Sequence, residues 1–326
     1  MEILIIGAGA LGCLFGALLA PRASVSLFTT NTDHARAINQ SGLVLIGMDN
    51  RHRNLTIPVL TDPAAYGRRA DLILLCTKAR STESAAATAR QLLAENGLIL
   101  TLQNGLGNLE KIIAAVGPER AAAGITAQGA TLLAPGQVRH AGNGVTQLAV
   151  GPGQSAAIAA IAALFNRAGI ETRINDDVDT LLWSKLIVNV GINALAALLR
   201  VPNGVLAEVA ECGELMAEAV AEAVAVARAL GIDFDDDQQL DRVRQVCVQT
   251  RANRASMLQD VLRGAPTEID VINGAVVAKG REVGIATPVN LLLTRLVKAL
   301  EATAAQRIAP LAATTTTKET PCNPKS

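Results

Sequence analysis

The stretch GAGALG at residues 7–12 constrains the fold of this chain more than any other feature. It follows an apolar run, EILII at 2–6, and it opens a stretch with helical character, ALGCLFGALLA at 10–20. A G-x-G-x-x-G sequence between a strand and a helix is typical of the phosphate-binding turn of a dinucleotide-binding βαβ unit. The start of the chain therefore predicts a Rossmann-type fold.

The glycines of this loop have separate expected tasks. Gly7 allows the tight turn, Gly9 lets the backbone approach a pyrophosphate, and Gly12 lets helix and strand pack closely. The anion would lie at the helix N-terminus, where free N–H groups and the helix dipole favour it. A glycine-rich turn without a ligand is the plainer alternative. The expected cofactor-binding loop is Gly7, Ala8, Gly9, Ala10, Leu11 and Gly12.

Short β-type runs alternate with helical stretches in the first half of the chain. SVSLF at 24–28, DLILLCTK at 71–78 and GLILTLQ at 97–103 are the continuous apolar runs expected of a parallel sheet covered on both faces. GLVLIG and NLTIPVL, between 42 and 62, look like an inserted pair of short strands.

Strand patterns nearly vanish from about residue 177, and five helical stretches follow, at 177–200, 204–231, 238–263, 268–283 and 288–308. We therefore predict an α/β protein in which a Rossmann-type domain over 1–172 precedes an all-helical substrate domain over 173–308. The polar tail, 309–326, is expected to be disordered because it has little apolar surface to bury.

Composition excludes several classes of partner. Lysine plus arginine equals aspartate plus glutamate at 29 each, and aromatic residues are 2%, so nucleic acid is not an expected partner. The five cysteines are scattered without metal-ligand spacing, which favours a reduced cytoplasmic setting and no metal site. No signal peptide is expected, and the longest apolar stretches, interrupted by Asn or Glu, predict buried helices rather than membrane spans.

The end of the second strand bears on the choice of dinucleotide. An acid there would bind the ribose 2′-hydroxyl of NAD, and an arginine would suit the 2′-phosphate of NADP. The sequence has Thr29, Thr30, Asn31 and Thr32 instead, so neither signal is present and NADP is slightly favoured because no carboxylate repels the phosphate. Arg36 could assist, or it could be an ordinary solvated helix residue.

Two polar residues are expected at the mouth of the sheet, where ligands of open α/β sheets bind. Lys78 and Asn104 each follow an apolar strand. The plainer alternatives are an exposed lysine at a strand end and a turn asparagine before glycine. Together with the glycine loop they indicate cofactor contacts.

Lys185, Asn189 and Asn193 are four residues apart in a helical stretch that is otherwise apolar. Residues at this spacing share one side of a helix, and buried lysine and amide groups are costly without partners. A solvated polar stripe is the plainer alternative. Further on, Thr267 and Asp270 resemble a capping box, which would put Glu268 in the first turn of a helix.

These motifs together resemble the ketopantoate reductase (2-dehydropantoate 2-reductase) family. The resemblance runs in order from about residue 1 to 300 and rests on GAGALG, CTK at 76–78, QNG at 103–105, WSKLIVNVGIN at 183–193, PNG at 202–204, NRASMLQD at 253–260 and TEIDVING at 267–274. It implies NADPH-dependent reduction of 2-dehydropantoate to pantoate, a step toward pantothenate and coenzyme A. One departure is that Thr30 stands where the family often has the arginine for the 2′-phosphate.

The resemblance also implies residue roles, with Lys185 and Glu268 as the catalytic residues. Lys185 would be the general acid, and Glu268 a carboxylate that binds the substrate and contacts the cofactor. Lys78 and Thr30 would lie on the cofactor side. The implied substrate-binding residues are Asn104, Asn189, Asn193, Asn203, Asn253 and Ser256. The protein would be a monomer or a homodimer acting on a small 2-oxo acid, with no membrane partner. The alternatives are a related NAD(P)-dependent reductase of another 2-oxo acid and a non-catalytic dinucleotide-sensing protein.

Overall fold

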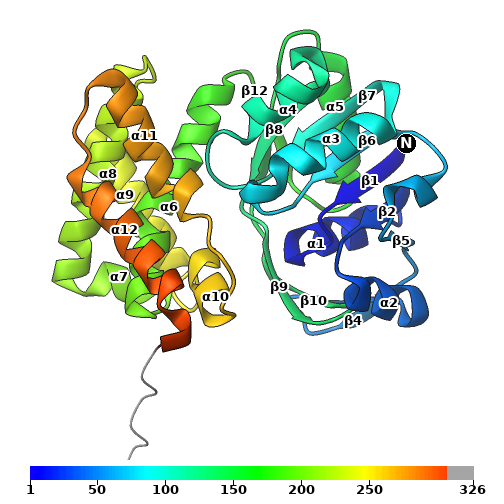
Figure 1. Cartoon of the computed structure of the whole chain (residues 1–326), viewed down its shortest axis with the longest axis horizontal. Helices are drawn as coiled ribbons and strands as arrows, with labels where there is room; N and C mark the ends of the chain where they lie inside the picture. Colours follow the sequence, from blue (N-terminus) through cyan, green and yellow to red (C-terminus); the bar gives the residue numbers. More distant parts are fainter. Residues whose placement is uncertain (307–326) are drawn as a thin grey trace, which may run out of the picture.

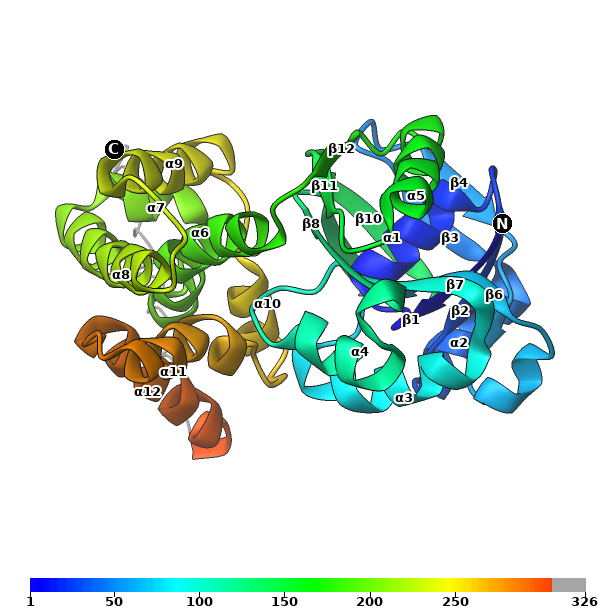
Figure 2. The ribbon, with the colours of Figure 1, turned by 90° about the horizontal axis from the view of Figure 1, so that it is seen from above.

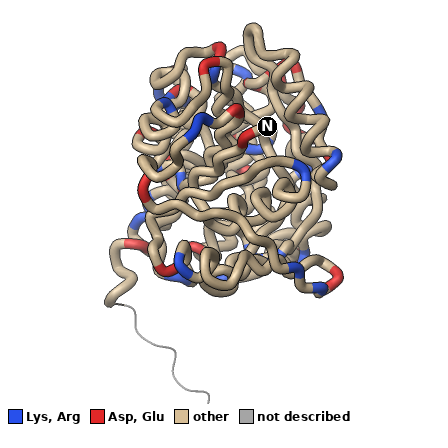
Figure 3. The backbone as a smooth tube through the Cα atoms, turned by 90° about the vertical axis from the view of Figure 1, so that its right-hand side faces the viewer, with Lys and Arg blue, Asp and Glu red and all other residues tan. Residues whose placement is uncertain are grey.

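Residues 1–306 are described by the computed structural model, and they form a sheet-containing half and a helical half that lie side by side (Figure 1). The predicted disordered tail, 309–326, lies outside the described residues. The predicted fold class is confirmed, because a mostly parallel sheet precedes an all-helical region. Acidic and basic residues are interspersed along the side of the sheet domain that Figure 3 shows.

An eight-stranded sheet organises the first half, in the order β12-β11-β8-β7-β6-β1-β2-β5. All neighbouring strands are parallel except β8 and β11. The strands are β1 (Glu2–Ile6), β2 (Ser24–Phe28), β5 (Val59–Leu60), β6 (Ala70–Leu75), β7 (Leu93–Thr101), β8 (Ala121–Thr126), β11 (Thr146–Ala149) and β12 (Thr172–Asn175). Strand β12 extends the sheet across the limit predicted at residue 172, and that limit stays a prediction.

Helices cover both faces of this sheet (Figure 2). On one face lie α1 (Ala10–Leu19) and α5 (Ser155–Arg167), joined by an edge-to-face contact between Phe15 and Phe165 with ring centres 5.6 Å apart. On the other face lie α3 (Thr82–Leu92) and α4 (Asn108–Val116). Burial on both faces explains why the strands are continuously apolar rather than alternating.

A second, four-stranded sheet packs against α1, in the order β4-β3-β10-β9. The predicted inserted pair is confirmed only in part. GLVLIG contains β3 (Leu43–Ile46), which pairs antiparallel with β4 (His52–Leu55), but NLTIPVL covers the end of β4 and then β5 of the main sheet. The later segments β9 (Gly129–Ala134) and β10 (Gln137–Gly142) complete the four-stranded sheet, and α2 (Thr32–Ser41) packs beside it.

The second half is built around α6 (Val178–Leu199), which leads from the sheet domain into the helical one (Figure 2). By length and composition alone α6 could cross a membrane, but 72% of its most apolar window is buried inside the protein, as predicted for a core helix. Around it pack α7 (Asn203–Glu208), α8 (Ala210–Ala229), α9 (Asp236–Gln249), α10 (Ser256–Leu262), α11 (Asn273–Val283) and α12 (Pro288–Ala302).

Two of the predicted long helices are wrong in extent. The stretch 204–231 divides into α7 and α8 at Val209, whose backbone is extended, and 238–263 divides into α9 and α10. The second break has a tertiary cause, because the carbonyls of Arg251 and Asn253 accept hydrogen bonds from the N–H groups of Gly204 and Asn203. These carbonyls thus face a distant segment, and the resulting loop carries Asn253.

The loop after β7 joins the two halves through its backbone. Leu106 N–H donates to the carbonyl of Val271, at 3.0 Å, and the Leu106 side chain packs against the core of the helical half. Gly105 has φ +82°, and a Cβ atom at this position would lie 2.3 Å from the Val271 carbonyl oxygen. The close approach therefore requires glycine at 105 for conformation and for space.

We predict that Gly105→Ala destabilises the protein more than Gly107→Ala. Both glycines have positive φ, but a Cβ at Gly107 would meet nothing within 4 Å. Each substitution should lose about 1–2 kcal/mol to the left-handed conformation, and Gly105→Ala should lose about 1–3 kcal/mol more by separating the loop from Val271. Urea unfolding of the two variants measures the difference, and equal losses would contradict a specific contact at Gly105.

Candidate active site between the two domains

The glycine loop has the geometry of an anion cradle. Gly7 has φ +105°, and a Cβ there would lie 2.6 Å from the backbone nitrogen of Thr77. A Cβ at Gly12 would lie 2.1 Å from the Gly7 carbonyl oxygen. Both positions therefore exclude a side chain, and the turn holds β1 close to α1.

The start of α1 leaves its backbone N–H groups available to a ligand. Its N-cap is Gly9, which has no side chain to cap the helix, and no acidic residue lies in the first turn. A Cβ at Gly9 would meet nothing within 4 Å, so open space lies directly against the backbone. Unpartnered N–H groups, the helix dipole and this space together fit a pyrophosphate.

The end of β2 presents no cation that is free for a 2′-phosphate. Thr30 is exposed, and Asn31 caps α2 by accepting from the His34 N–H at 3.0 Å. Arg36 pairs instead with Asp33, at 3.1 Å on the exposed face of α2. The predicted assistance from Arg36 stays a prediction, and in this structure its guanidinium is engaged elsewhere.

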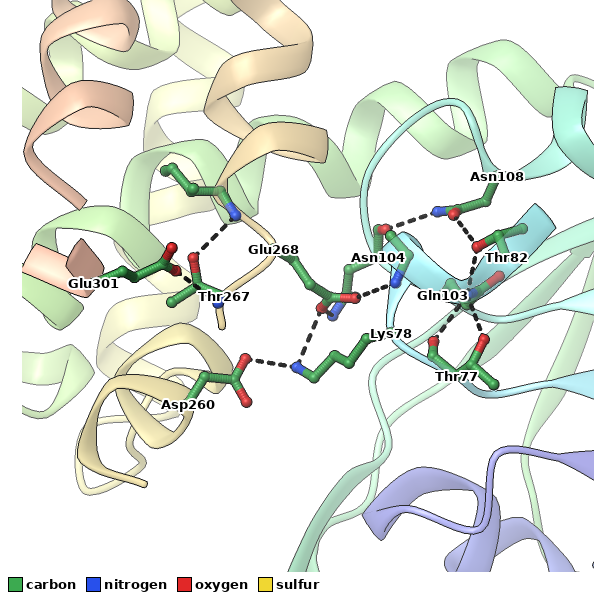
Figure 4. A network of polar contacts seen from close by, with 12 residues as sticks. Thr77, Lys78, Thr82, Gln103, Asn104, Asn108, Asp260, Thr267, Glu268 and Glu301 are labelled. Carbon is green, nitrogen blue, oxygen red and sulfur yellow. Dashed lines mark hydrogen bonds and ion pairs between the residues drawn. The ribbon is translucent and has the colours of Figure 1, made fainter. Parts of the chain in front are cut away.

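A buried carboxylate at the domain junction collects contacts from the sheet domain (Figure 4). Glu268 Oε1 accepts from the Ala79 N–H at 3.2 Å, and Oε2 accepts from Asn104 Nδ2 at 3.4 Å. Lys78 Nζ lies 3.5 Å from Oε2 and only 2.6 Å from Oδ2 of Asp260, on α10. Both carboxylates are buried, with side-chain exposures of 8% and 7%. The structure thus brings Lys78, Asn104 and Glu268 together.

The loop that carries Asn104 is fixed by amides and hydroxyls beneath it (Figure 4). Gln103 Nε2 donates to the Thr77 carbonyl at 2.8 Å and to the Thr82 hydroxyl at 2.9 Å. Asn108 Nδ2 donates to the Asn104 carbonyl at 3.0 Å. Because these groups are mostly buried and paired, they hold Asn104 in a defined orientation toward Glu268.

The polar face of α6 lies in a largely apolar setting. Burial lowers the pKa of Lys185 from its ordinary value of 10.5 to about 8, and the Glu268 carboxylate partly opposes this effect. Among residues 1–306 no hydrogen bond or ion pair engages Lys185 Nζ. The Nδ2 atoms of Asn189 and Asn193 are buried and have no partner among the described residues either. Three donors on one helix face are thus held without protein acceptors.

The predicted capping role of Thr267 and Asp270 is wrong. The Thr267 hydroxyl accepts from the Ile269 N–H, Asp270 pairs with Lys298, and the segment Ile269–Val271 is a short 3-10 helix. Glu268 precedes that turn, and its side chain reaches the sheet domain instead of capping. Interdomain hydrogen bonds therefore decide its orientation, and local helix chemistry does not.

The remaining predicted substrate residues are Asn203, which begins α7, Asn253, in the loop before α10, and Ser256, which begins α10. Asn203 N–H donates to the Asn253 carbonyl at 3.0 Å, and Asn203 Nδ2 donates to Thr250, which leaves its Oδ1 buried without a partner among the described residues. Asn253 is exposed, and Ser256 begins α10 half-buried and makes no polar contact within residues 1–306. The structure thus joins Asn203 to Asn253 and packs α10, which Ser256 begins, against α6.

Sequence reasoning missed Asp260 and the backbone N–H of Ala79. Asp260 had a faint signal, because it is an acid within SMLQDVL, a short helical stretch that is otherwise mostly apolar. Burial raises the pKa of its carboxyl, and the Lys78 ammonium lowers it. The Ala79 contact has no sequence signal, because any residue except proline supplies the same N–H.

Comparisons with known proteins agree over nearly the whole chain. Residues 3–153 match the family described as ketopantoate reductase PanE/ApbA, and residues 177–301 match its C-terminal domain. A 2-dehydropantoate 2-reductase of Pyrococcus abyssi is 40% identical over 93% of this chain and 98% of its own length. One of Halobacterium salinarum is 38% identical over 91% and 98%.

Solved structures show the same similarity. A PanE/ApbA family ketopantoate reductase from Ralstonia eutropha is 33% identical, with a TM-score of 0.84 over 94% of this chain and 100% of its own. A D-mandelate dehydrogenase bound to NADH and anilino(oxo)acetate is 30% identical, with a TM-score of 0.89 over 94% and 100%.

We predict that Lys185→Met makes the protein more stable at pH 7. A lysine whose folded pKa lies near 8 is destabilised in its charged form, and the penalty is fully present below that pH. Removing the amine should raise the free energy of unfolding by about 1–3 kcal/mol. Urea unfolding measures this, with Lys111→Met, at an exposed lysine, as the control expected to change little. A clear loss of stability in Lys185→Met would contradict the prediction.

Proposed function

The chain belongs to the ketopantoate reductase family, and on that premise we propose that it reduces the ketone of 2-dehydropantoate to the alcohol of pantoate. The reaction adds a hydride to the ketone carbon and a proton to the ketone oxygen. We assign the proton to Lys185. The family is one of pyridine-nucleotide-dependent reductases, and this supports hydride delivery from a nicotinamide.

One observation carries the proposal, namely the three polar groups on the inner face of α6. The buried Nδ2 groups of Asn189 and Asn193, which have no acceptor among the described residues, cost about 1–3 kcal/mol each, and a protein that binds nothing there would gain that stability by losing them. A 2-oxo acid supplies a ketone oxygen and a carboxylate, and both accept hydrogen bonds. Lys185, Asn189 and Asn193 therefore match the acceptor-rich end of such a substrate.

The protonation state of Lys185 suits a general acid. With a pKa near 8 the amine is mostly protonated at neutral pH, yet it gives up its proton more readily than an ordinary lysine. Negative charge develops on the ketone oxygen as the carbon is reduced, and an ammonium at that oxygen stabilises it. Glu268 favours the charged lysine before the reaction. Turnover should therefore fall as the pH rises through about 8.

We assign the cofactor to the residues at the sheet edge. The backbone of Gly7, Ala8, Gly9, Ala10, Leu11 and Gly12 would hold the pyrophosphate, and Thr30, Lys78, Asn104 and Glu268 would contact the rest. When bound, the nicotinamide supplies the hydride. Asn104 Nδ2 and the Ala79 N–H, which already donate to Glu268, would fix that carboxylate where cofactor and substrate meet.

The remaining substrate contacts come from the loop and helix opposite α6. Ser256 carries a hydroxyl without a polar partner among the described residues, and we assign it with Asn253 to the carboxylate end of the substrate. Asn203, whose Oδ1 is buried and unpaired within residues 1–306, would line the same pocket. A carbonyl oxygen there accepts from a hydroxyl, a group that the product and the substrate both carry.

A second candidate is reduction of another 2-oxo acid. It is favoured by the fold similarity to a D-mandelate dehydrogenase, whose structure holds NADH and anilino(oxo)acetate. A panel of 2-oxo acids, assayed with NADPH and with NADH, separates the candidates. Turnover of an aryl or simple aliphatic 2-oxo acid without turnover of 2-dehydropantoate would replace the first proposal. Cofactor binding with no turnover of any member would indicate a sensing protein.

We also infer a cytoplasmic location and a monomeric or homodimeric state, with no nucleic acid or membrane partner. The support is the chemistry of the pathway step, the scattered cysteines and the balanced charge. Sedimentation of the purified full chain would decide between monomer and dimer.

We predict that Lys185→Ala lowers turnover of 2-dehydropantoate by a factor of about 10² to 10⁴, the usual range for a positioned general acid. Cofactor affinity should stay nearly unchanged, because Lys185 lies on the helical side and the pyrophosphate site is on α1. Steady-state rates and cofactor fluorescence titration measure the two quantities. A normal rate in the variant would refute the assignment of the proton donor.

We predict that the protein uses NADPH with a modest preference over NADH, and that Thr30→Arg increases this preference about tenfold or more through a bidentate contact with the 2′-phosphate. Thr30→Gln, which adds length without charge, is the control and should leave the ratio close to its original value. The ratio of kcat/KM for the two cofactors is the measurement. An unchanged ratio in Thr30→Arg would mean that Thr30 does not face the phosphate.

A further inference from the structure

The buried acid that sequence reasoning missed, Asp260, has no role in the function proposed above. We infer that Asp260 is a positioning residue that holds the Lys78 ammonium away from Glu268, so that the Glu268 carboxylate remains available to Lys185. The inference deepens the proposed function and rests on it for the role of Lys185 as acid.

The unequal distances around Lys78 are the first support. Its Nζ lies 2.6 Å from Asp260 Oδ2 and 3.5 Å from Glu268 Oε2 (Figure 4). The ammonium therefore pairs mainly with Asp260 and only weakly with Glu268. Lys78 comes from the sheet domain and both acids come from the helical domain. Among the described residues of the sheet domain, Lys78 is the one cation that lowers the pKa of Asp260. Arg263, at the end of α10, lowers it less.

The second support is the demand placed on Glu268. This carboxylate accepts from Ala79 N–H and Asn104 Nδ2, and it acts electrostatically on Lys185. If Asp260 lost its charge, Glu268 would be the one acid still paired with Lys78 among the described residues, and an unpaired ammonium beside a buried carboxylate moves to it. Glu268 would then be neutralised from the sheet side, and its attraction for the Lys185 ammonium would weaken.

The charge balance of the junction is the third support. Asp260 and Glu268 supply two negative charges, and Lys78 and Lys185 supply two positive charges, all within one partly buried region. Among the described residues, Glu268 is the one charged group that acts on the pKa of Lys185. Loss of the Asp260 charge therefore reaches Lys185 through Lys78 and Glu268, and it makes the charged form of Lys185 less favourable.

Asp260→Asn tests the inference because it keeps the shape of the side chain and removes its charge. We expect the pKa of Lys185 to fall from about 8, by about 0.5 to 1.5 units, because the attraction of the Glu268 carboxylate for the Lys185 ammonium weakens. The titration is followed by NMR of isotope-labelled lysine in the full chain, with the resonance assigned by Lys185→Met. Asp270→Asn removes an exposed acid paired with Lys298 and should leave the titration unmoved.

The same substitution in Lys78→Met protein distinguishes an effect of Asp260 through Lys78 from a direct electrostatic effect of Asp260 on Lys185. In Lys78→Met protein there is no ammonium to redirect, so adding Asp260→Asn should hardly move the Lys185 titration. An equal downward shift in both backgrounds would mean that Asp260 acts directly on Lys185 and would overturn the inference. An unmoved titration in Asp260→Asn alone would overturn it as well.

The pH dependence of turnover supplies the functional readout. The fall in kcat at high pH should move to lower pH in Asp260→Asn, whereas a merely structural residue would lower the rate equally at every pH. The NMR titration needs no turnover. A protein that reduces no 2-oxo acid would therefore contradict the proposed function and still allow the effect of Asp260 on Lys185 to be decided.

Discussion

A buried carboxylate at the junction of the two domains is the constraint on which the site depends. Glu268 is too deeply buried to keep a charge without partners, and its partners lie on segments near residues 79, 104 and 185. Each domain therefore supplies what the other lacks. The end of β6 and the loop after β7 bring donors, while α6 brings the lysine. The site exists only where the domains meet, which makes their docking part of the chemistry.

The apolar character of α6 follows from the same constraint. A fully hydrated lysine keeps an ordinary pKa, whereas Lys185, on a helix whose other faces carry the buried Leu186, Ile187 and Val190, loses much of its hydration. The long, continuous packing of α6 against α8, α9 and α10 holds this unfavourable arrangement in place. The large hydrophobic core around α6 thus offsets the destabilising effect of the polar groups of Lys185, Asn189 and Asn193. Such a local loss of stability is typical of active sites.

Local signals explain how much the sequence could predict. The glycine loop, the βαβ order and the spacing of Lys185, Asn189 and Asn193 depend on neighbours in the chain, so the fold class and the polar face of α6 were predictable. The break that places Asn253 was not, because it depends on hydrogen bonds to Asn203 and Gly204 from about fifty residues earlier in the chain. Asp260 is a similar case, since its partner Lys78 is 182 residues away. The local pattern put Glu268 in the first turn of a helix, which is wrong because its donors belong to the other domain. Only the family resemblance assigned Glu268 to the site.

The loop after β7 carries both the proposed cofactor contact and the contact between the two domains. Asn104 is directed at Glu268, Gly105 lies against Val271, and Leu106 enters the core of the helical domain. Of these three consecutive residues, Asn104 contacts the carboxylate of the proposed site, Gly105 allows the backbone contact between the domains, and Leu106 makes the apolar contact. A rotation of the domains that opened the site would pull Leu106 from its core and separate Asn104 from Glu268 together. Opening the site therefore requires loss of the apolar contact of Leu106. A bound ligand that contacts Asn104 and Glu268 would favour the arrangement in which the two domains are docked.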